Sequence, residues 1–215
     1  MDETIAAICN NFQVNPRFAN IETALNAISN YFSSIKELND IDGLQANYGP
    51  HSDDVGMHSR RVASLLTNFS EFNILSTNDK NIVKISAYLH DIGKGPKSRW
   101  PNEVMSSADN DHAAKSLPML KRILTEDIGG LDEESVRKIV MLVTYDDLVG
   151  DIVARGRHEV QLFNVIKSES DLNMLVALGK ADMFSINQTW VYSYHDAIEA
   201  LKQRAISSLN TGVAC

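Results

Sequence analysis

Long apolar runs, clusters of basic residues and cysteine pairs are all missing from this chain of 215 residues. No segment approaches 18 uninterrupted apolar residues, so the sequence contains no candidate for a membrane-spanning helix. No run of Lys and Arg exceeds two residues and the net charge is −8, which argues against a surface that binds duplex nucleic acid. A local pocket for one small anion is still compatible with this charge.

The cysteines and the N-terminal segment bear on the cellular compartment. Cys9 and Cys215 are too few for a disulfide framework and lack metal-ligand spacing. The first twelve residues are acidic and contain no positively charged lead before an apolar core, so we do not expect a signal peptide. These features predict a cytoplasmic protein in a reducing environment.

Apolar residues recur at helical spacing through most of the chain, and no segment shows the alternation of a convincing strand. We therefore predict an all-α fold. Residues 1–50 are predicted as an N-terminal helical extension that supplies packing or homodimer contacts, and residues 51–215 as the main domain. Helices are expected at 54–72, from Ser76 or Thr77 to 90, 109–128, after Asp132, near 159–168, from Ser170 or Asp171 and at 194–209, with a loop at 151–156.

The most informative stretch is AYLHDIGKG, where an apolar helical run ends in His90-Asp91. An imidazole beside a carboxylate suits a divalent cation, and Lys94 three residues later could meet a phosphate as a point charge. A second such pair, His195-Asp196, opens a predicted helix instead of ending one. Because Asp is common at helix starts, we interpret this second pair as capping or first-turn chemistry.

Three more side chains of the kinds that bind metal ions lie on the apolar stripes of other predicted helices: His58, His112 and Asp182. Either histidine could instead be a hydrogen-bonded core residue, and Asp182 could pair with a buried Arg or Lys. A buried polar group is costly unless something satisfies it. A shared divalent cation would satisfy all of these side chains at once, and this is the interpretation that we favour.

The order His58, His90-Asp91 and then Asp182 resembles the HD superfamily of metal-dependent phosphohydrolases, over about residues 50–190. The HDIGK form at 90–94 is similar to that of the HD-GYP phosphodiesterases, and His112 matches the next His of two-metal members. The resemblance implies an HD-type helical bundle in which Asp91 bridges two metal ions. It also implies that the ions activate a water molecule that attacks phosphorus.

The chain departs from the HD-GYP pattern in two places. The Gly-Tyr-Pro signature is missing, which argues against cyclic di-GMP as the substrate. Where two-metal members carry an adjacent His pair, this chain has Asp146-Asp147. Aspartate ligands would favour harder ions such as Mn²⁺ or Mg²⁺, although Fe, Ni, Co and Zn stay open. We expect one or two divalent ions, the second held by His112 and one of these acids, unless both acids are solvated helix-end residues.

Together these residues predict a metal-dependent hydrolase of phosphate mono- or diesters, with a nucleotide or another small phosphorylated metabolite as substrate. Asp91 and Lys94 are the predicted catalytic residues. Lys94 and Arg61 are predicted phosphate contacts, unless either is a solvated surface cation. Substrate contacts are also expected from the loop at 95–108, which carries Lys97, Arg99 and Trp100.

Two other classes of function stay open at this point. The chain could be a non-hydrolytic sensor or binding module that keeps the metal cage. It could also be a purely structural helical protein with buried polar pairs, which would bind no metal.

Overall fold

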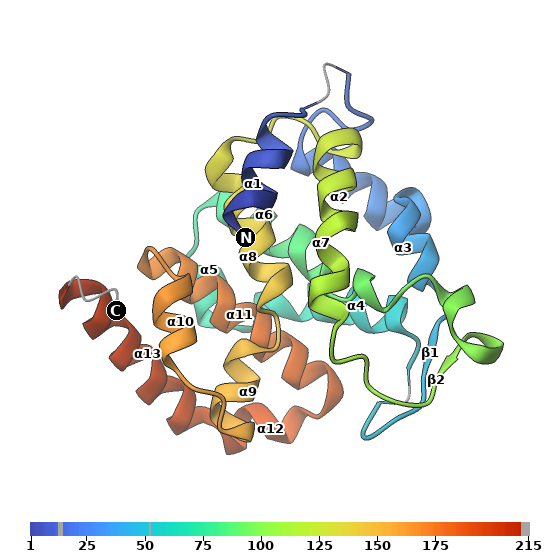
Figure 1. Cartoon of the computed structure of the whole chain (residues 1–215). Helices are drawn as coiled ribbons and strands as arrows, with labels where there is room; N and C mark the ends of the chain where they lie inside the picture. The colour runs from blue at the N-terminus through green and yellow to red at the C-terminus, as the bar shows by residue number, and fades with distance from the viewer. Residues whose placement is uncertain (13–14, 52, 212–215) are drawn as a thin grey trace.

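The computed structural model describes residues 1–12, 15–51 and 53–211. These residues are helical apart from loops and one short parallel strand pair, β1 (Gln45–Ala46) with β2 (Val104–Met105) (Figure 1). The prediction of an all-α fold is therefore confirmed. None of the helices in the described part of the chain combines the length and apolar character needed to cross a membrane. Cys215 lies outside the described residues.

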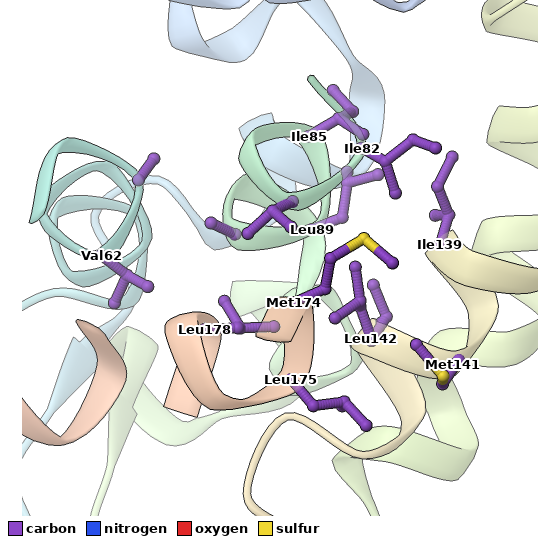
Figure 2. Packing of buried hydrophobic residues seen from close by; sticks show 14 of the residues in the cluster. Val62, Ile82, Ile85, Leu89, Ile139, Met141, Leu142, Met174, Leu175 and Leu178 are labelled. Carbon is purple, nitrogen blue, oxygen red and sulfur yellow. The ribbon is translucent and has the colours of Figure 1, made fainter. Parts of the chain in front are cut away.

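The centre of the molecule is a bundle formed by α4 (Val55–Leu65), α6 (Thr77–Leu89), α8 (Glu133–Thr144) and α11 (Glu169–Ile186). Figure 2 shows their apolar side chains meeting in one core. Eight of these side chains are completely buried. They are Val62 on α4, Ile82, Ile85 and Leu89 on α6, Ile139 and Leu142 on α8, and Met174 and Leu178 on α11. Because the C-terminal half of α6 has no exposed residue, the residues that follow Leu89 lie inside the molecule and not at its surface.

Each central helix begins at a side chain that accepts a hydrogen bond from its first turn. The caps are Asp54 for α4, Ser76 for α6, Asp132 for α8 and Ser168 for α11. Such caps satisfy backbone N–H groups that have no partner inside the helix. The caps of α6 and α8 agree with the sequence prediction, whereas α11 begins slightly earlier than predicted.

The N-terminal helices pack on the same core. Helix α1 (Asp2–Cys9) contacts α8, α2 (Ile21–Asn30) contacts α6, and α3 (Lys36–Ile41) contacts the turn after α6. The buried carboxylate of Glu37 on α3 also pairs with Arg122. These contacts tie the segment firmly to the bundle, and the proposed boundary between residues 1–50 and 51–215 stays a prediction.

The remaining helices surround the bundle. They are α5 (Ser70–Asn73), α7 (His112–Arg122), α9 (Leu148–Arg155), α10 (Val160–Val165), α12 (Gln188–Ser193) and α13 (His195–Thr211). The predicted loop at 151–156 is wrong, because α9 is helical as far as Arg155. Its Leu148 and Val149 are buried, and Gly156 ends it at a φ of 74°, a left-handed conformation that glycine adopts readily.

Other boundaries also differ from the sequence prediction. The helix expected at 54–72 ends at Leu65, where a 3₁₀ turn leads into α5. The C-terminal helix expected at 194–209 is preceded by a separate short helix, α12, which is capped by Asn187. The helix expected at 109–128 runs through Pro118 to Arg122 and continues as a π-helical turn. His195-Asp196 does lie at the start of α13, as expected.

A buried ion cluster joins α5, α11 and α13. The carboxylate of Glu71 is 2 % exposed, and the ammonium groups of Lys180 and Lys202 each lie 2.7 Å from it. Burial alone would raise the pKa of Glu71, but the hydrogen bonds from the two lysines lower it to about 2. Glu71 therefore stays ionised and holds three separate helices together.

We expect Glu71→Gln to lower the free energy of unfolding by about 1–3 kcal/mol at neutral pH, because the buried ammonium group of Lys180 and the partly buried one of Lys202 lose one charged partner and keep only the more exposed Glu199. The native pKa is below the unfolded value of about 4.5, so this stabilisation is complete above pH 4.5 and is lost as the pH falls towards 2. The difference in melting temperature between the wild type and the variant should therefore shrink over that range. Exposed Glu22→Gln is the control, and a pH-independent difference would contradict the assignment.

Candidate metal centre

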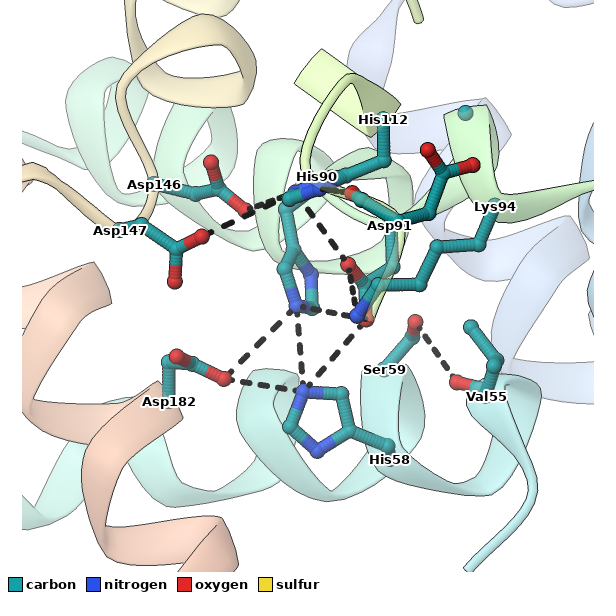
Figure 3. Close-up of polar contacts among 12 residues, drawn as sticks. Val55, His58, Ser59, His90, Asp91, Lys94, His112, Asp146, Asp147 and Asp182 are labelled. Atoms are coloured by element: carbon teal, nitrogen blue, oxygen red, sulfur yellow. Dashed lines mark hydrogen bonds and ion pairs between the residues drawn. The ribbon is translucent and has the colours of Figure 1, made fainter. Parts of the chain in front are cut away.

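Four side chains predicted to bind one metal ion meet at the centre of the bundle (Figure 3). His58 comes from α4, His90 and Asp91 follow α6, and Asp182 comes from α11. The Nε2 atom of His58 lies 2.9 Å from Asp182 Oδ1 and 3.3 Å from His90 Nε2. Asp91 Oδ2 is 3.5 Å from the same His90 nitrogen. The structure thus brings together residues that are up to 124 positions apart in the sequence.

Backbone carbonyl groups set the orientation of two of the imidazole rings. His90 Nδ1 is 2.8 Å from the carbonyl oxygen of Ala87, and His112 Nδ1 is 2.8 Å from that of Asp109. A carbonyl oxygen can only accept a hydrogen bond, so in both rings Nδ1 must carry the hydrogen. Unless the ring is protonated, Nε2 is then left with a free lone pair, which is the form that binds metal.

The ring of His58 is fixed in the same way by a serine hydroxyl. Ser185 Oγ donates to the carbonyl oxygen of Asp182 at 2.8 Å and lies 3.0 Å from His58 Nδ1. Because its only hydrogen is used in the first bond, the hydroxyl accepts from His58 Nδ1. His58 therefore also directs Nε2 at the cluster. No pattern in the sequence pointed to Ser185, since a single serine on a helix is common and has no specific role in most cases.

In this arrangement hydrogen-bond acceptors face one another with no donor between them. The Nε2 atom of His58 is at hydrogen-bond distance from His90 Nε2 and from Asp182 Oδ1, and His90 Nε2 lies 3.5 Å from Asp91 Oδ2, yet both rings carry their hydrogen on Nδ1. Facing lone pairs in a buried site repel one another unless a proton or a metal ion lies between them. The donor set of imidazole nitrogen and carboxylate oxygen fits a divalent transition metal or Mg²⁺. The site therefore fits the group that the sequence predicts.

Lys94 is buried beside Asp91. Its Nζ atom lies 2.7 Å from both carboxylate oxygens, and the main-chain carbonyl of Lys94 accepts hydrogen bonds from Arg99 and Trp100. Burial alone would raise the pKa of Asp91, but the charge of Lys94 and the neighbouring histidines hold it well below its usual range. Asp91 is thus an ionised carboxylate with two oxygens directed at the centre.

The second predicted ligand group lies on the other side of Asp91. His112 Nε2, at the start of α7, is 3.4 Å from Asp146 Oδ2, 3.8 Å from Asp91 Oδ1 and 4.0 Å from Asp147 Oδ2. The side chain of Asp146 is 5 % exposed and that of Asp147 is 47 % exposed. Both acids therefore reach the site, with Asp146 inside it and Asp147 at its edge.

The charges of this second group depend on one another. The neighbouring Asp146 carboxylate, together with burial, raises the pKa of Asp147 to about 7. Burial would lower the pKa of His112, but its hydrogen bond with Asp146 and the charges of Asp146 and Asp91 raise it to about 10. This concentration of negative charge again favours a bound cation.

The metal centre forms the floor of a cavity of about 780 Å³. Tyr48 and His51, from the segment before α4, also line it with ring centroids 4.7 Å apart, and no sequence pattern marks them as site residues. Arg61 does not line this cavity; its guanidinium group pairs with Asp53 and donates to the Ser185 carbonyl. It borders a smaller cavity of about 50 Å³ that also reaches Asp91.

The loop at 95–108 stays a predicted source of substrate contacts, and its Ala108 lines the cavity. Lys97 donates to the Asp42 carbonyl at 2.9 Å, and Arg99 and Trp100 both donate to the carbonyl of Lys94. Arg99 and Trp100 therefore anchor the turn that carries Lys94, whereas Lys97 is held at the end of α3. Carbonyl groups at the end of a helix or 3₁₀ turn have no helical partner, and these long donors supply one.

A model of the HD domain family matches residues 55–161 of the chain. The chain belongs to the HD domain family. Proteins with this domain are generally metal-dependent hydrolases. The match to the HD domain contains His58, His90-Asp91, His112 and Asp146-Asp147, whereas Asp182 lies beyond it and reaches the HD centre through the packing of α11. No curated protein and no solved structure matches the chain.

The turn after His90-Asp91 is packed too closely for any side chain at Gly93. A Cβ atom there would lie 1.9 Å from the main-chain oxygen of His112, and 2.7 Å from Ser116 Oγ. Since these atoms belong to the first turns of α7, Gly93 sets how near His112 can approach Asp91.

We expect Gly93→Ala to lower the free energy of unfolding by about 1–3 kcal/mol or more, because α7 has to move away from the turn. Gly150→Ala is the matched control, since its Cβ would meet only Met183 at an ordinary 3.5 Å and alanine favours the helix. Thermal unfolding of both variants checks this. Equal melting temperatures for the two would show that the close contact at Gly93 does not constrain the fold.

Proposed function

We propose that the chain is a metal-dependent hydrolase of phosphate mono- or diesters, and that its substrate is a nucleotide or another small phosphorylated metabolite. The observation that carries this proposal is the convergence of imidazole Nε2 atoms and carboxylates, with facing lone pairs, at the floor of an open cavity. Membership of the HD domain family supports the same class of chemistry. The cavity has the size of a small-molecule site.

In this proposal His58, His90, Asp91 and Asp182 hold the first ion. His112 and Asp146 would hold a second one, with Asp147 beside them, and Asp91 lies within reach of both ligand groups. Bound divalent ions would lower the pKa of a water molecule and neutralise charge on the phosphoryl oxygens. The four aspartates of the site bring the negative charge that two divalent ions would balance.

The protein side chains contribute position and charge. Lys94 keeps its ammonium group within 2.7 Å of Asp91, where it can also face a phosphoryl oxygen and stabilise developing negative charge. The side chains of Arg99 and Trp100, which donate to the main-chain carbonyl of Lys94, hold this residue in place. Arg61 stays a proposed phosphate contact, because its cavity also borders Asp91 and Lys94.

The first test separates the two His-Asp pairs of the chain. Asp91→Ala should lower hydrolysis of an aryl phosphoester more than about 100-fold, since it removes a carboxylate shared by both ion sites. Asp196→Ala should leave the rate unchanged, because Asp196 lies in the first turn of α13. Rates are measured with Mn²⁺, Mg²⁺ and other divalent ions.

Circular dichroism of both variants serves as the folding control. Equal loss of activity in the two folded variants would contradict the choice of His90-Asp91. A wild-type chain that binds metal but hydrolyses no phosphoester would instead be a binding module.

The second test counts the ions. We expect two Mn²⁺ ions per chain for the wild type in excess metal, and one for His112→Ala, with exposed His195→Ala as the control. Chelation should lower the melting temperature, because an ion that binds only the folded state stabilises it. Elemental analysis and thermal unfolding provide the two measurements. One ion in the wild type, unaffected by the His112 substitution, would reduce the proposal to a single-metal enzyme.

A further inference from the structure

The cavity above the metal centre has two chemically different parts. Its floor consists of histidines and carboxylates, whereas one wall is made by apolar and aromatic side chains of α11, α12 and the residues after them. This wall contains Met183, Ile186, Trp190 and Tyr194. A ligand that fills the cavity therefore meets ionic groups at one end and a largely apolar surface at the other.

The side chains of this wall continue a row that begins at Asp182 of the metal centre. Asp182, Ile186, Trp190 and Tyr194 follow one another at intervals of four residues, and all four line the cavity. Helix α11 ends at Ile186, and Asn187 caps α12 by accepting from the backbone N–H of the second residue after it. The chain therefore passes from α11 to α12 while side chains at the same four-residue spacing continue to line the cavity. Together they form one row that begins at the metal centre.

Trp190 has no evident packing role in this row. It is partly exposed and is not part of the core cluster, whereas Trp100 packs against that cluster and donates its indole N–H to Lys94. Among the described residues, the indole N–H of Trp190 has no hydrogen-bond partner within the protein. An aromatic ring that lines a cavity without a partner in the protein offers a flat surface on which a ligand ring can stack.

The charged residues near this wall are already paired. Arg155 Nη1 lies 2.9 Å from Asp151 Oδ1, and Arg157 Nη1 lies 3.4 Å from Oδ2 of the same carboxylate. Both arginines line the cavity, but one shared aspartate engages them. Tyr194, the other aromatic side chain of the row, packs against the core cluster, so the indole of Trp190 is the aromatic surface of this row that is left for a ligand.

We propose that Trp190 stacks on a planar ring in the part of the substrate that does not react. The substrate would then be a phosphoester whose other end carries a heteroaromatic ring, as in a nucleoside monophosphate, with its phosphate over the metal centre. This inference rests on the proposed phosphohydrolase function and adds the residue that determines specificity.

The kinetic test compares adenosine 5′-monophosphate with ribose 5-phosphate, which lacks the ring. Stacking on an aromatic side chain is worth about 1–3 kcal/mol, so Trp190→Ala should raise the KM for the nucleotide by roughly 5- to 150-fold. The kcat for the nucleotide and the KM for ribose 5-phosphate should change little, and Trp190→Phe should retain most of the discrimination. Tyr192→Ala, on the same helix but 74 % exposed, is the matched control. Equal KM changes for both substrates, or none for the nucleotide, would overturn the proposal.

A binding measurement separates this inference from the proposed function. Adenosine 5′-monophosphate, titrated into the Mg²⁺-loaded protein, should quench the tryptophan fluorescence of the wild type but not that of Trp190→Phe, which keeps only Trp100. Quenching without hydrolysis of either substrate would disprove the proposed function and support stacking. Hydrolysis of the nucleotide with equal quenching in both proteins would overturn the stacking proposal alone.

Discussion

The repulsion between the buried hydrogen-bond acceptors of the metal centre is the constraint on which the rest of this structure depends. Three imidazole rings donate through Nδ1 to fixed oxygens of the protein, and so direct Nε2 at carboxylates and, for His58 and His90, at each other. Such a centre is stable only with positive charge inside it. Lys94 supplies one charge on Asp91, and the proposed divalent ions would supply the remainder. The chemistry proposed for the site follows from the same need for positive charge.

The bundle satisfies this constraint by close packing. The C-terminal half of helix α6 has no exposed residue, so its end delivers His90 and Asp91 to the interior, and the turn that follows lies against the start of α7 with no room for a side chain at Gly93. The long donors Arg99 and Trp100 then fix the same turn from outside. Residues that look like substrate contacts in the sequence are thus part of the frame that holds the centre together.

Periodicity was informative where one face of a helix meets the core and uninformative where a helix is short. The stripes containing His58, His112 and Asp182 were visible because apolar residues repeat around each of them over several turns. Helix α9 was missed, since its eight residues include Gly150 and Asp151 and lack a capping side chain. The choice between Asp146 and Asp147 was also beyond the sequence, because adjacent residues at a helix end can both turn inward or outward. In the structure one is buried and the other lies at the edge.

The sequence by itself determined the helical fold class and a candidate ligand set, because amphipathic spacing and the position of polar residues within apolar stripes are local properties. Only the tertiary structure showed which imidazole nitrogen faces the centre, since that depends on Ser185 and on carbonyl groups from other turns. It likewise placed Tyr48, His51 and Trp190 around one cavity with the metal centre. Their common location is set by the packing of distant segments, and no local pattern in the chain encodes such a distance.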